Sequence, residues 1–278
     1  MKKIKITGAV ACLLILFISS CKKQEQVDST LVKENALVNN CGTNSSSENS
    51  SARMAYNTFY GPVTQMGNGT ARSWINISKN NIPLAIGIEM THSSLQNLPS
   101  DPMDHEAATY LLKLHQKAHD LTAFDHIVLN WEPEGHEPNG IYSVPHFDMH
   151  FYTISTSAQM AITSLPTASP AAGYLPASYV IQAVTIAGMG THWLDPSSPE
   201  LPPTFQPFTH TFIYGSNNGG VIFMEPMITR DFLMSGTSVT KPFPQSTLFA
   251  ESTYYPSTYN IWMEGGKHYV SLSDFSMR

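Results

Sequence analysis

Basic charge, cysteine and the familiar catalytic motifs are all scarce in this chain. The net charge is −6, so we expect neither a nucleic acid nor an anionic membrane face as a partner, because both favour a basic surface. No G-x-S-x-G elbow, P-loop, Rossmann fingerprint or H-E-x-x-H motif occurs, which sets aside the enzyme classes that depend on them. Only three cysteines are present, and Cys41 lies in a polar stretch where it is a poor candidate for a nucleophile.

The N-terminus is typical of an exported protein. Three lysines within the first five residues form a basic region, and the apolar run 9–18 is too short to span a bilayer as a helix. The following Ile-Ser-Ser-Cys at 18–21 resembles the lipobox of bacterial lipoproteins. This resemblance implies cleavage before Cys21 and a lipid anchor on its sulfur; the alternative is an ordinary secretory signal with a chance cysteine. Lys22 favours sorting to the outer membrane, facing either the periplasm or the cell surface.

Cleavage would divide the chain into a signal peptide (1–20), a lipidated tether (21–52) and a single globular domain (53–278). The tether lacks aromatic residues and is rich in Ser and Asn, so we expect it to be disordered. Removing 1–20 takes away three lysines and no acid, which moves the net charge from −6 to about −9. Cys41 would then be the one unlipidated cysteine, so the domain must depend on its core and not on disulfides.

The domain itself is predicted to be mainly β, either a sandwich or a barrel, with a cupin-like form and an α+β fold as alternatives. Its short apolar or alternating runs are separated by turn signals. The segment 214–221, YGSNNGGV, is typical of a hairpin turn, because Asn and Gly tolerate positive φ. Examples of the expected strands are residues 73–78, 83–90, 124–131, 146–154, 209–215, 221–226 and 268–275.

One packed α-helix is expected near 102–120. Asp101 is a suitable N-cap and Pro102 suits the first helical position. Leu111, Leu114 and Ala118 recur at helical spacing and would form a buried stripe.

The stretch 144–152, VPHFDMHFY, carries the densest chemistry. As a strand it places His146, Asp148, His150 and Tyr152 on one face and apolar residues on the other. His146 and His150 would be about 13 Å apart, too far for one ion to bind both from a straight strand. Asp148 lies one strand period from each, so it could share an ion with either histidine.

Further ligands must come from other segments. His136 lies in a turn-like loop just before this strand, His192 follows two glycines, and Glu225 is an acid in apolar surroundings. The predicted metal ligands are His136, His146, Asp148, His150 and His192, with Glu225, His126, Tyr142 and Tyr152 as secondary candidates. Imidazole and carboxylate suit zinc, iron, manganese or copper, so a divalent transition metal is the expected cofactor. In the alternative interpretation the histidines are hydrogen-bonded structural residues.

From Gly69 to its end the chain resembles a family of secreted bacterial proteins without a known activity. The resemblance rests on FDHIVLNWEPEGHEPNGIYSVPHFDMHFY, GMGTHWLD and FIYGSNNGGVIFMEPMITRDFL. It implies that the six residues His136, His146, Asp148, His150, His192 and Glu225 belong to one constellation. The first cupin motif offers a weaker likeness: Gly140 precedes His146 by the right interval, but Asp148 stands in place of the second histidine and no Glu follows soon after.

Three functions follow from these observations. The first is a metal-dependent envelope enzyme in which Tyr142 or Tyr152 steadies an intermediate. The second is a non-catalytic protein that holds a metal or small ligand. The third is a structural lipoprotein that assembles with copies of itself through an aromatic surface.

Overall fold

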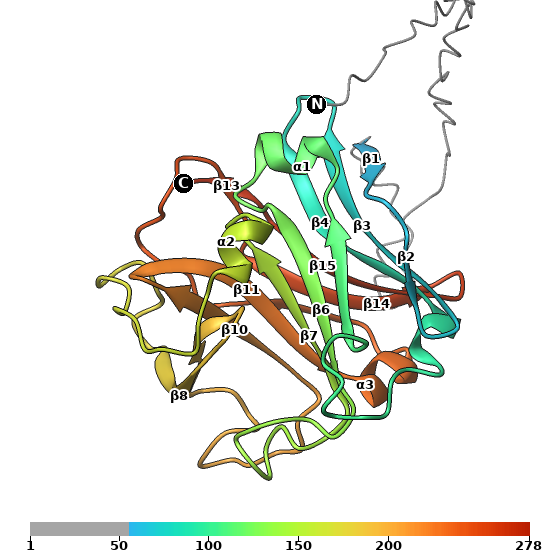
Figure 1. Ribbon diagram of the computed structural model, residues 1–278. Helices are drawn as coiled ribbons and strands as arrows, with labels where there is room; N and C mark the ends of the chain where they lie inside the picture. Colours follow the sequence, from blue (N-terminus) through green and yellow to red (C-terminus); the bar gives the residue numbers. More distant parts are fainter. Residues whose placement is uncertain (1–55) are drawn as a thin grey trace, which may run out of the picture. The chain divides into compact units, whose positions relative to one another are not determined.

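Two antiparallel sheets of seven strands each make up most of the computed structural model, which describes residues 56–278 (Figure 1). The predicted signal peptide, lipobox and tether lie outside the described residues. No helix within 56–278 has the length and hydropathy needed to cross a membrane.

The first sheet, sheet A, runs in the order β1-β3-β4-β15-β14-β12, and β2 pairs with β3. Its edges are β1 and β12, so it does not close on itself. Its strands are β1 (Tyr56–Tyr60), β2 (Thr64–Met66), β3 (Gly69–Ser78), β4 (Pro83–Thr91), β12 (Val239–Pro242), β14 (Thr258–Glu264) and β15 (Lys267–Ser273).

The second sheet, sheet B, runs in the order β5-β6-β7-β11-β10-β9-β8 and is also open. Its central strand is β11 and its central hairpin joins β10 to β11. Its strands are β5 (Thr109–Lys113), β6 (His126–Glu132), β7 (His146–Tyr152), β8 (Val180–Ile186), β9 (Gly190–Leu194), β10 (His210–Asn217) and β11 (Gly220–Thr229). A small pair, β13 (Tyr254–Tyr255) and β16 (Ser276–Met277), completes the strands of the described region.

The two sheets pack face to face around the main hydrophobic core. Ile75 and Ile86 of sheet A and Ile127 and Phe147 of sheet B belong to one buried cluster. Each such side chain contributes about 1.5–3 kcal/mol when it is fully buried. Two open, packed sheets form a sandwich-like arrangement, which confirms the predicted mainly β class.

The turn between β10 and β11 is the predicted hairpin. Asn217 pairs with Gly220, and the two residues between them, Asn218 and Gly219, have φ angles of 48° and 80°. Positive φ at both central positions is the type I′ geometry, whose twist matches that of paired strands. The sequence signal and the structure agree here because the turn depends on local chemistry alone.

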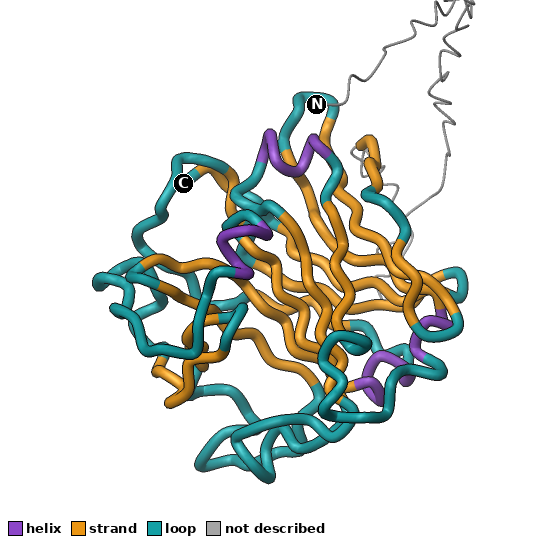
Figure 2. The backbone as a smooth tube through the Cα atoms, viewed as in Figure 1, coloured by secondary structure: helices purple, strands orange, loops and turns teal. Residues whose placement is uncertain are grey.

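The helix predicted near 102–120 is present only in its last part. Residues 109–113 form strand β5, whose Tyr110 stands opposite Leu129 of β6, and the α-helix α1 covers only Gln116–Leu121. Figure 2 shows how short the helices of the described region are. The edge of β6 provides hydrogen-bonding partners for β5, and strand alternation buries both Tyr110 and Leu112. This pairing outweighs helix propensity, which is a weak determinant of structure.

The remaining helical turns are also short. Within the described residues they are the 3₁₀ turn η1 (His92–Leu95) and the helices α2 (Thr156–Met160) and α3 (Arg230–Ser235). Ser155 and Thr229 cap α2 and α3 by accepting backbone N–H groups with their side chains.

Connections cover the face of sheet B that points away from sheet A. Tyr142, Leu201 and Phe208 from these connections pack with Ile213 and Met227 of the sheet in a small apolar cluster. A second small cluster on the same face includes Val128, Tyr152, Ile162 and Phe223. The polar side chains of this outer face lie among these clusters and are therefore largely shielded from water.

Candidate metal centre

Strand β7 divides its residues between the hydrophobic core and the polar outer face of sheet B. Phe147, Met149 and Phe151 belong to the sandwich core. The alternate side chains lie on the opposite face, as the sequence pattern predicted, and all are buried: His146, Asp148, His150 and Tyr152.

Neighbouring strands bring further polar residues to this face. Glu225 is on β11, which lies beside β7, and His192 is on β9, which is separated from β11 by β10. Gly215 of β10 stands opposite His192. A Cβ atom at position 215 would overlap the ring of Phe223, so the glycine leaves room for that ring against β10. The ring centroid of Phe223 is 4.7 Å from that of His150 and 5.3 Å from that of His192.

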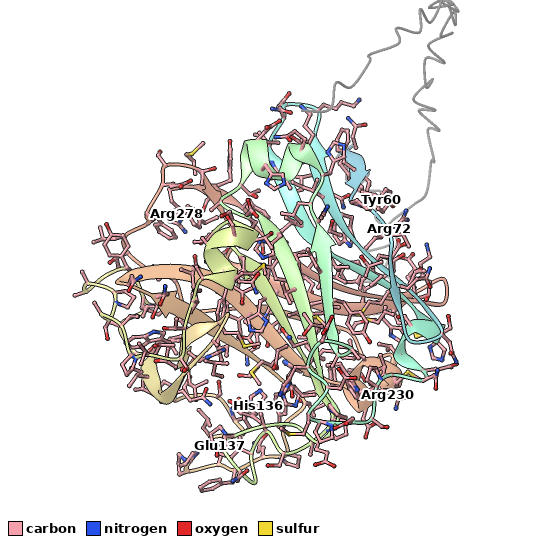
Figure 3. All side chains as sticks on the ribbon, viewed as in Figure 1. Tyr60, Arg72, His136, Glu137, Arg230 and Arg278 are labelled. Atoms are coloured by element: carbon pink, nitrogen blue, oxygen red, sulfur yellow. The ribbon has the colours of Figure 1, made fainter. Side chains whose placement is uncertain are left out.

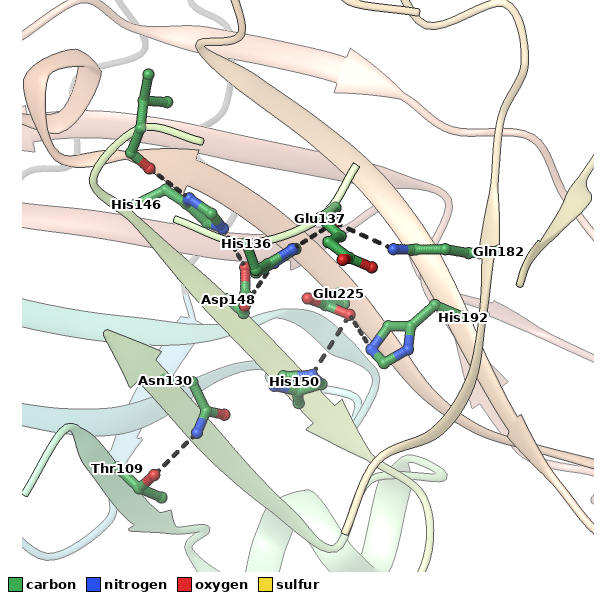
Figure 4. Close-up of polar contacts among 11 residues, drawn as sticks. Thr109, Asn130, His136, Glu137, His146, Asp148, His150, Gln182, His192 and Glu225 are labelled. Carbon is green, nitrogen blue, oxygen red and sulfur yellow. Dashed lines mark hydrogen bonds and ion pairs between the residues drawn. The ribbon is translucent and has the colours of Figure 1, made fainter. Parts of the chain in front are cut away.

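One group, which we call the outer triad, consists of His136, His146 and Asp148 (Figure 4). Asp148 Oδ2 is 3.2 Å from His136 Nε2, and Asp148 Oδ1 is 3.1 Å from His146 Nε2. Both histidines donate Nδ1–H to a backbone carbonyl, at 2.6 Å for His136 to Glu137 and 2.7 Å for His146 to Val144. In the neutral rings, Nε2 therefore carries the lone pair that faces Asp148.

The electric field in the outer triad favours a positive charge. Burial alone would lower the pKa of His136, but Asp148 outweighs it and raises this pKa to about 9. Burial would raise the pKa of Asp148, yet His146 and His136 hold it well below its usual range. The carboxylate is thus ionised at neutral pH, and a proton on His136 balances it when no other cation is bound.

The second group, the inner triad, consists of His150, His192 and Glu225. Glu225 Oε2 is 3.4 Å from His150 Nε2 and 3.7 Å from His192 Nε2. The exposed fractions of the three side chains are 0%, 7% and 1%. Neither contact is an aligned hydrogen bond, and Glu225 Oε2 and His150 Nε2 are both buried without a hydrogen-bond partner. Such orphaned groups are rare and costly in proteins.

The inner triad has no positive charge of its own. Burial lowers the pKa of His150 to about 4 and that of His192 to about 3, so both rings are neutral at pH 7. Burial, with the nearby charges of Asp148 and Glu132, raises the pKa of Glu225 well above its usual range. All three shifts have the same main cause, which is the loss of water around the ionised forms.

Asn130 of β6 is a further buried polar residue on this face. It stands opposite Asp148 in the pairing of β6 with β7. Its Nδ2 donates to Thr109 Oγ1 at 2.9 Å, which fixes the amide, while its Oδ1 is buried without a partner. The alternation along β6 was the only sequence signal for this residue. The amide therefore presents a further oxygen acceptor beside the two triads.

Of the secondary candidates, Glu225 belongs to the inner triad, whereas the other three have structural contacts that occupy their polar atoms. His126 bonds Asp125 through Nδ1 and Gln159 through Nε2, both at 2.9 Å, so neither nitrogen is free to bind an ion. Tyr142 donates to Glu200 at 3.2 Å, and Tyr152 donates to the Gly188 carbonyl at 2.9 Å.

The six residues expected in one constellation thus lie on one face but divide into two triads. Asp148 joins His146 and His136, whereas His150 and His192 meet Glu225 instead. Register explains the division, because Asp148 and His150 are one strand period apart, about 6.5–7 Å.

No protein-family model, curated protein or solved structure matches the chain. The resemblance to a secreted bacterial family therefore stays a prediction, and the chemistry rests on geometry. Within each triad the candidate ligand atoms lie within 4.8 Å of one another, so these buried His, Asp and Glu groups could bind a metal ion. Two histidines and one carboxylate suit zinc, iron, manganese or copper.

Proposed function

We propose that this protein is an envelope lipoprotein that binds a divalent transition-metal ion at the inner triad. The observation that carries the proposal is the meeting of Glu225 Oε2 with His150 Nε2 and His192 Nε2, at 3.4 and 3.7 Å, in a site shielded from water. Glu225 Oε2, both ring nitrogens of His150 and Nδ1 of His192 are buried there without a hydrogen-bond partner. A shared cation satisfies all three facing atoms at once, and small shifts of the side chains would bring them to metal–ligand distances.

The charges favour a metal ion over a network of protons. Both histidines are neutral at pH 7 and burial raises the pKa of Glu225, so without a bound ion the site has no positive charge to balance an ionised carboxylate. A divalent ion balances the carboxylate and accepts an electron pair from each ring. The apolar rings of Phe223 and Tyr152 exclude water that would compete for the ligands.

Three protein ligands leave at least one coordination position for water or a substrate. No fourth His, Cys, Asp or Glu of the described residues joins the inner triad. Two histidines with one carboxylate and an open position is the ligand set of hydrolytic zinc sites and of non-haem iron oxygenases. A metal-dependent enzyme is therefore the first candidate, since the ion would supply Lewis acidity and an activated water.

A non-catalytic metal-holding protein is the second candidate. The observation that favours it is burial, because the three ligands are between 0% and 7% exposed. Cobalt(II) substitution separates the two candidates. A change in the visible spectrum when azide or phosphate is added indicates an open position, and an unchanged spectrum indicates a closed, holding site.

The envelope location is proposed from the first 21 residues. The basic start, the short apolar run and the lipobox-like 18–21 together support lipidation of Cys21. Replacing Cys21 with Ser is expected to move the protein from the detergent phase to the aqueous phase, and a variant that stays in the detergent phase contradicts the anchor.

Metal analysis tests the central proposal. The protein is purified without chelator and without an affinity His-tag, and its metal content is measured by mass spectrometry. We expect bound metal in the parent protein and loss of the inner-triad ion in Glu225→Gln. The exposed His119 provides the control, because His119→Gln removes an imidazole that belongs to neither candidate ligand set of the described residues. A parent protein without metal after incubation with zinc and dialysis would overturn the proposal.

A further inference from the structure

The outer triad has the features of a second ligand set and differs from the inner triad in exposure to solvent. His146 Nε2 and Asp148 Oδ1 lie 3.1 Å apart, yet both are buried without an aligned hydrogen bond. His146 Nδ1 donates to the Val144 carbonyl, so its Nε2 presents a lone pair to the carboxylate. Two facing acceptors repel each other unless a cation lies between them.

Backbone carbonyls fix both imidazoles in the orientation that a metal site needs. The Glu137 carbonyl accepts from His136 Nδ1 at 2.6 Å and also from Gln182 Nε2 at 3.1 Å (Figure 4). Metal-binding histidines usually donate their second nitrogen to a carbonyl or carboxylate, which sets the tautomer and the ring direction. The outer triad has this arrangement at both of its histidines.

The two triads differ in how each is held and exposed. Every ligand of the inner triad is on a strand, and the same is true of His146 and Asp148. His136 alone is on a connection, between β6 and β7, and its side chain is 35% exposed, against 7% or less for the other five residues. Figure 3 shows His136 and Glu137 near the rim of sheet B, among the connections. A ligand on an exposed connection can leave and return far more easily than one on a buried strand.

We propose that His136, His146 and Asp148 form a second transition-metal site, and that its ion exchanges with solvent faster than the ion of the inner triad. The second site goes beyond the proposed function, because it depends on the geometry of the outer triad alone, whereas the comparison of exchange rates rests on the proposed inner site. Its ligand chemistry is again two imidazoles and one carboxylate, so the expected ion is a divalent transition metal and not calcium or magnesium.

The test is a zinc titration of the full chain, followed by removal of zinc with a chelator. The parent protein is expected to bind two ions, which EDTA removes in a fast and a slow phase of equal amplitude. His136→Gln should bind one ion and lose the fast phase, and Asp148→Asn should behave in the same way. Glu225→Gln should lose the slow phase instead.

A matched control is His105→Gln, which removes an exposed histidine that belongs to neither triad. It should keep both ions and both phases. Circular dichroism of each variant checks that the fold is retained, and His136→Gln is the least disruptive change because its side chain is partly exposed.

The outcomes distinguish this inference from the proposed function. If His136→Gln and Asp148→Asn both keep as many ions as the parent protein and the same removal kinetics, the outer triad is no metal site. If Glu225→Gln keeps all its metal, the inner-triad proposal is wrong. The outer-triad proposal is then still decided by the metal content of His136→Gln and Asp148→Asn. A single ion that is lost only with His136→Gln and Asp148→Asn would support the outer site and overturn the inner one.

Discussion

Two buried glutamates, one in each sheet, have opposite surroundings. Glu89 of sheet A is 7% exposed and receives Arg72 at 2.9 Å, Lys267 at 3.1 Å and the hydroxyl of Tyr269 at 3.2 Å. Glu225 of sheet B is 1% exposed, and its Oε2 faces the imidazole nitrogens of His150 and His192, which are neutral at pH 7.

The comparison shows how to recognise a candidate ligand among buried carboxylates. Glu89 is satisfied by charged and hydroxyl donors of neighbouring strands, so it stabilises sheet A as an ion-paired group. Glu225 Oε2 has no hydrogen-bond partner. A buried carboxylate oxygen without a donor is stabilised when a cation binds it. Burial alone does not separate the two; the chemistry of the partners does.

The largest expected effect is on metal-linked stability in Glu225→Gln. The amide retains the shape but removes the charge that balances a divalent ion, so we expect metal affinity at the inner triad to fall by at least about 100-fold. Zinc should then no longer raise the melting temperature through this site, whereas saturation at 100 times Kd stabilises the parent by about 2.7 kcal/mol. Calorimetry with and without zinc measures this, and an equal zinc-induced shift in both proteins would contradict it.

Acid should destabilise the metal-free protein through the inner histidines. Their folded pKa values, about 4 for His150 and about 3 for His192, lie below the ordinary value of 6.5. The stability that these two neutral histidines contribute is therefore fully present above pH 6.5. It is lost as the pH falls toward 3, because the unfolded chain binds the protons at a higher pH than the folded chain does. Each tenfold difference in proton affinity is worth about 1.4 kcal/mol.

Urea unfolding between pH 7 and pH 4 measures this loss of stability. A double variant, His150→Gln with His192→Gln, should have a flatter pH profile than the parent. An unchanged slope in the double variant would show that other groups cause the acid sensitivity.

Gly215→Ala is expected to disturb the inner triad through packing. The new methyl group overlaps the ring of Phe223, which must move away from His150 and His192. Overpacking of this kind costs about 1–3 kcal/mol. Denaturant unfolding should show this loss together with weaker zinc binding, and Gly219→Ala, at the exposed turn, serves as the comparison because it should lower stability but leave zinc binding intact.

The smallest effect is expected for Glu89→Gln. Arg72 and Lys267 are 28% and 38% exposed, so they regain water when their partner loses its charge. We expect a loss of about 1–2 kcal/mol in the free energy of unfolding and no change in metal content. Metal loss in this variant would contradict the assignment of Glu89 to ion pairing and of Glu225 to metal binding.

Local patterns predicted seven of the strands of the described region and the hairpin, but they predicted the helix poorly. The alternation in 146–152 identified both faces of β7, because side chains on a strand point to opposite sides whatever its partners are. The apparent helical stripe of Leu111, Leu114 and Ala118 was misleading, since β5 gains hydrogen bonds and burial beside β6 that an isolated segment lacks. Helix α1 forms only where that pairing ends.

The sequence by itself determined which residue types reach the outer face of sheet B, and that His136 lies close enough in the chain to fold back onto β7. Only the tertiary structure decided how these residues divide. Strand order places β11 beside β7, and Gly215 on β10 makes room for the Phe223 ring beside His192. Glu225 therefore joins His150 and His192. Asp148 contacts His146 and His136 instead. The physical reason is that register and strand order arise from contacts between segments far apart in the chain, which no local pattern encodes.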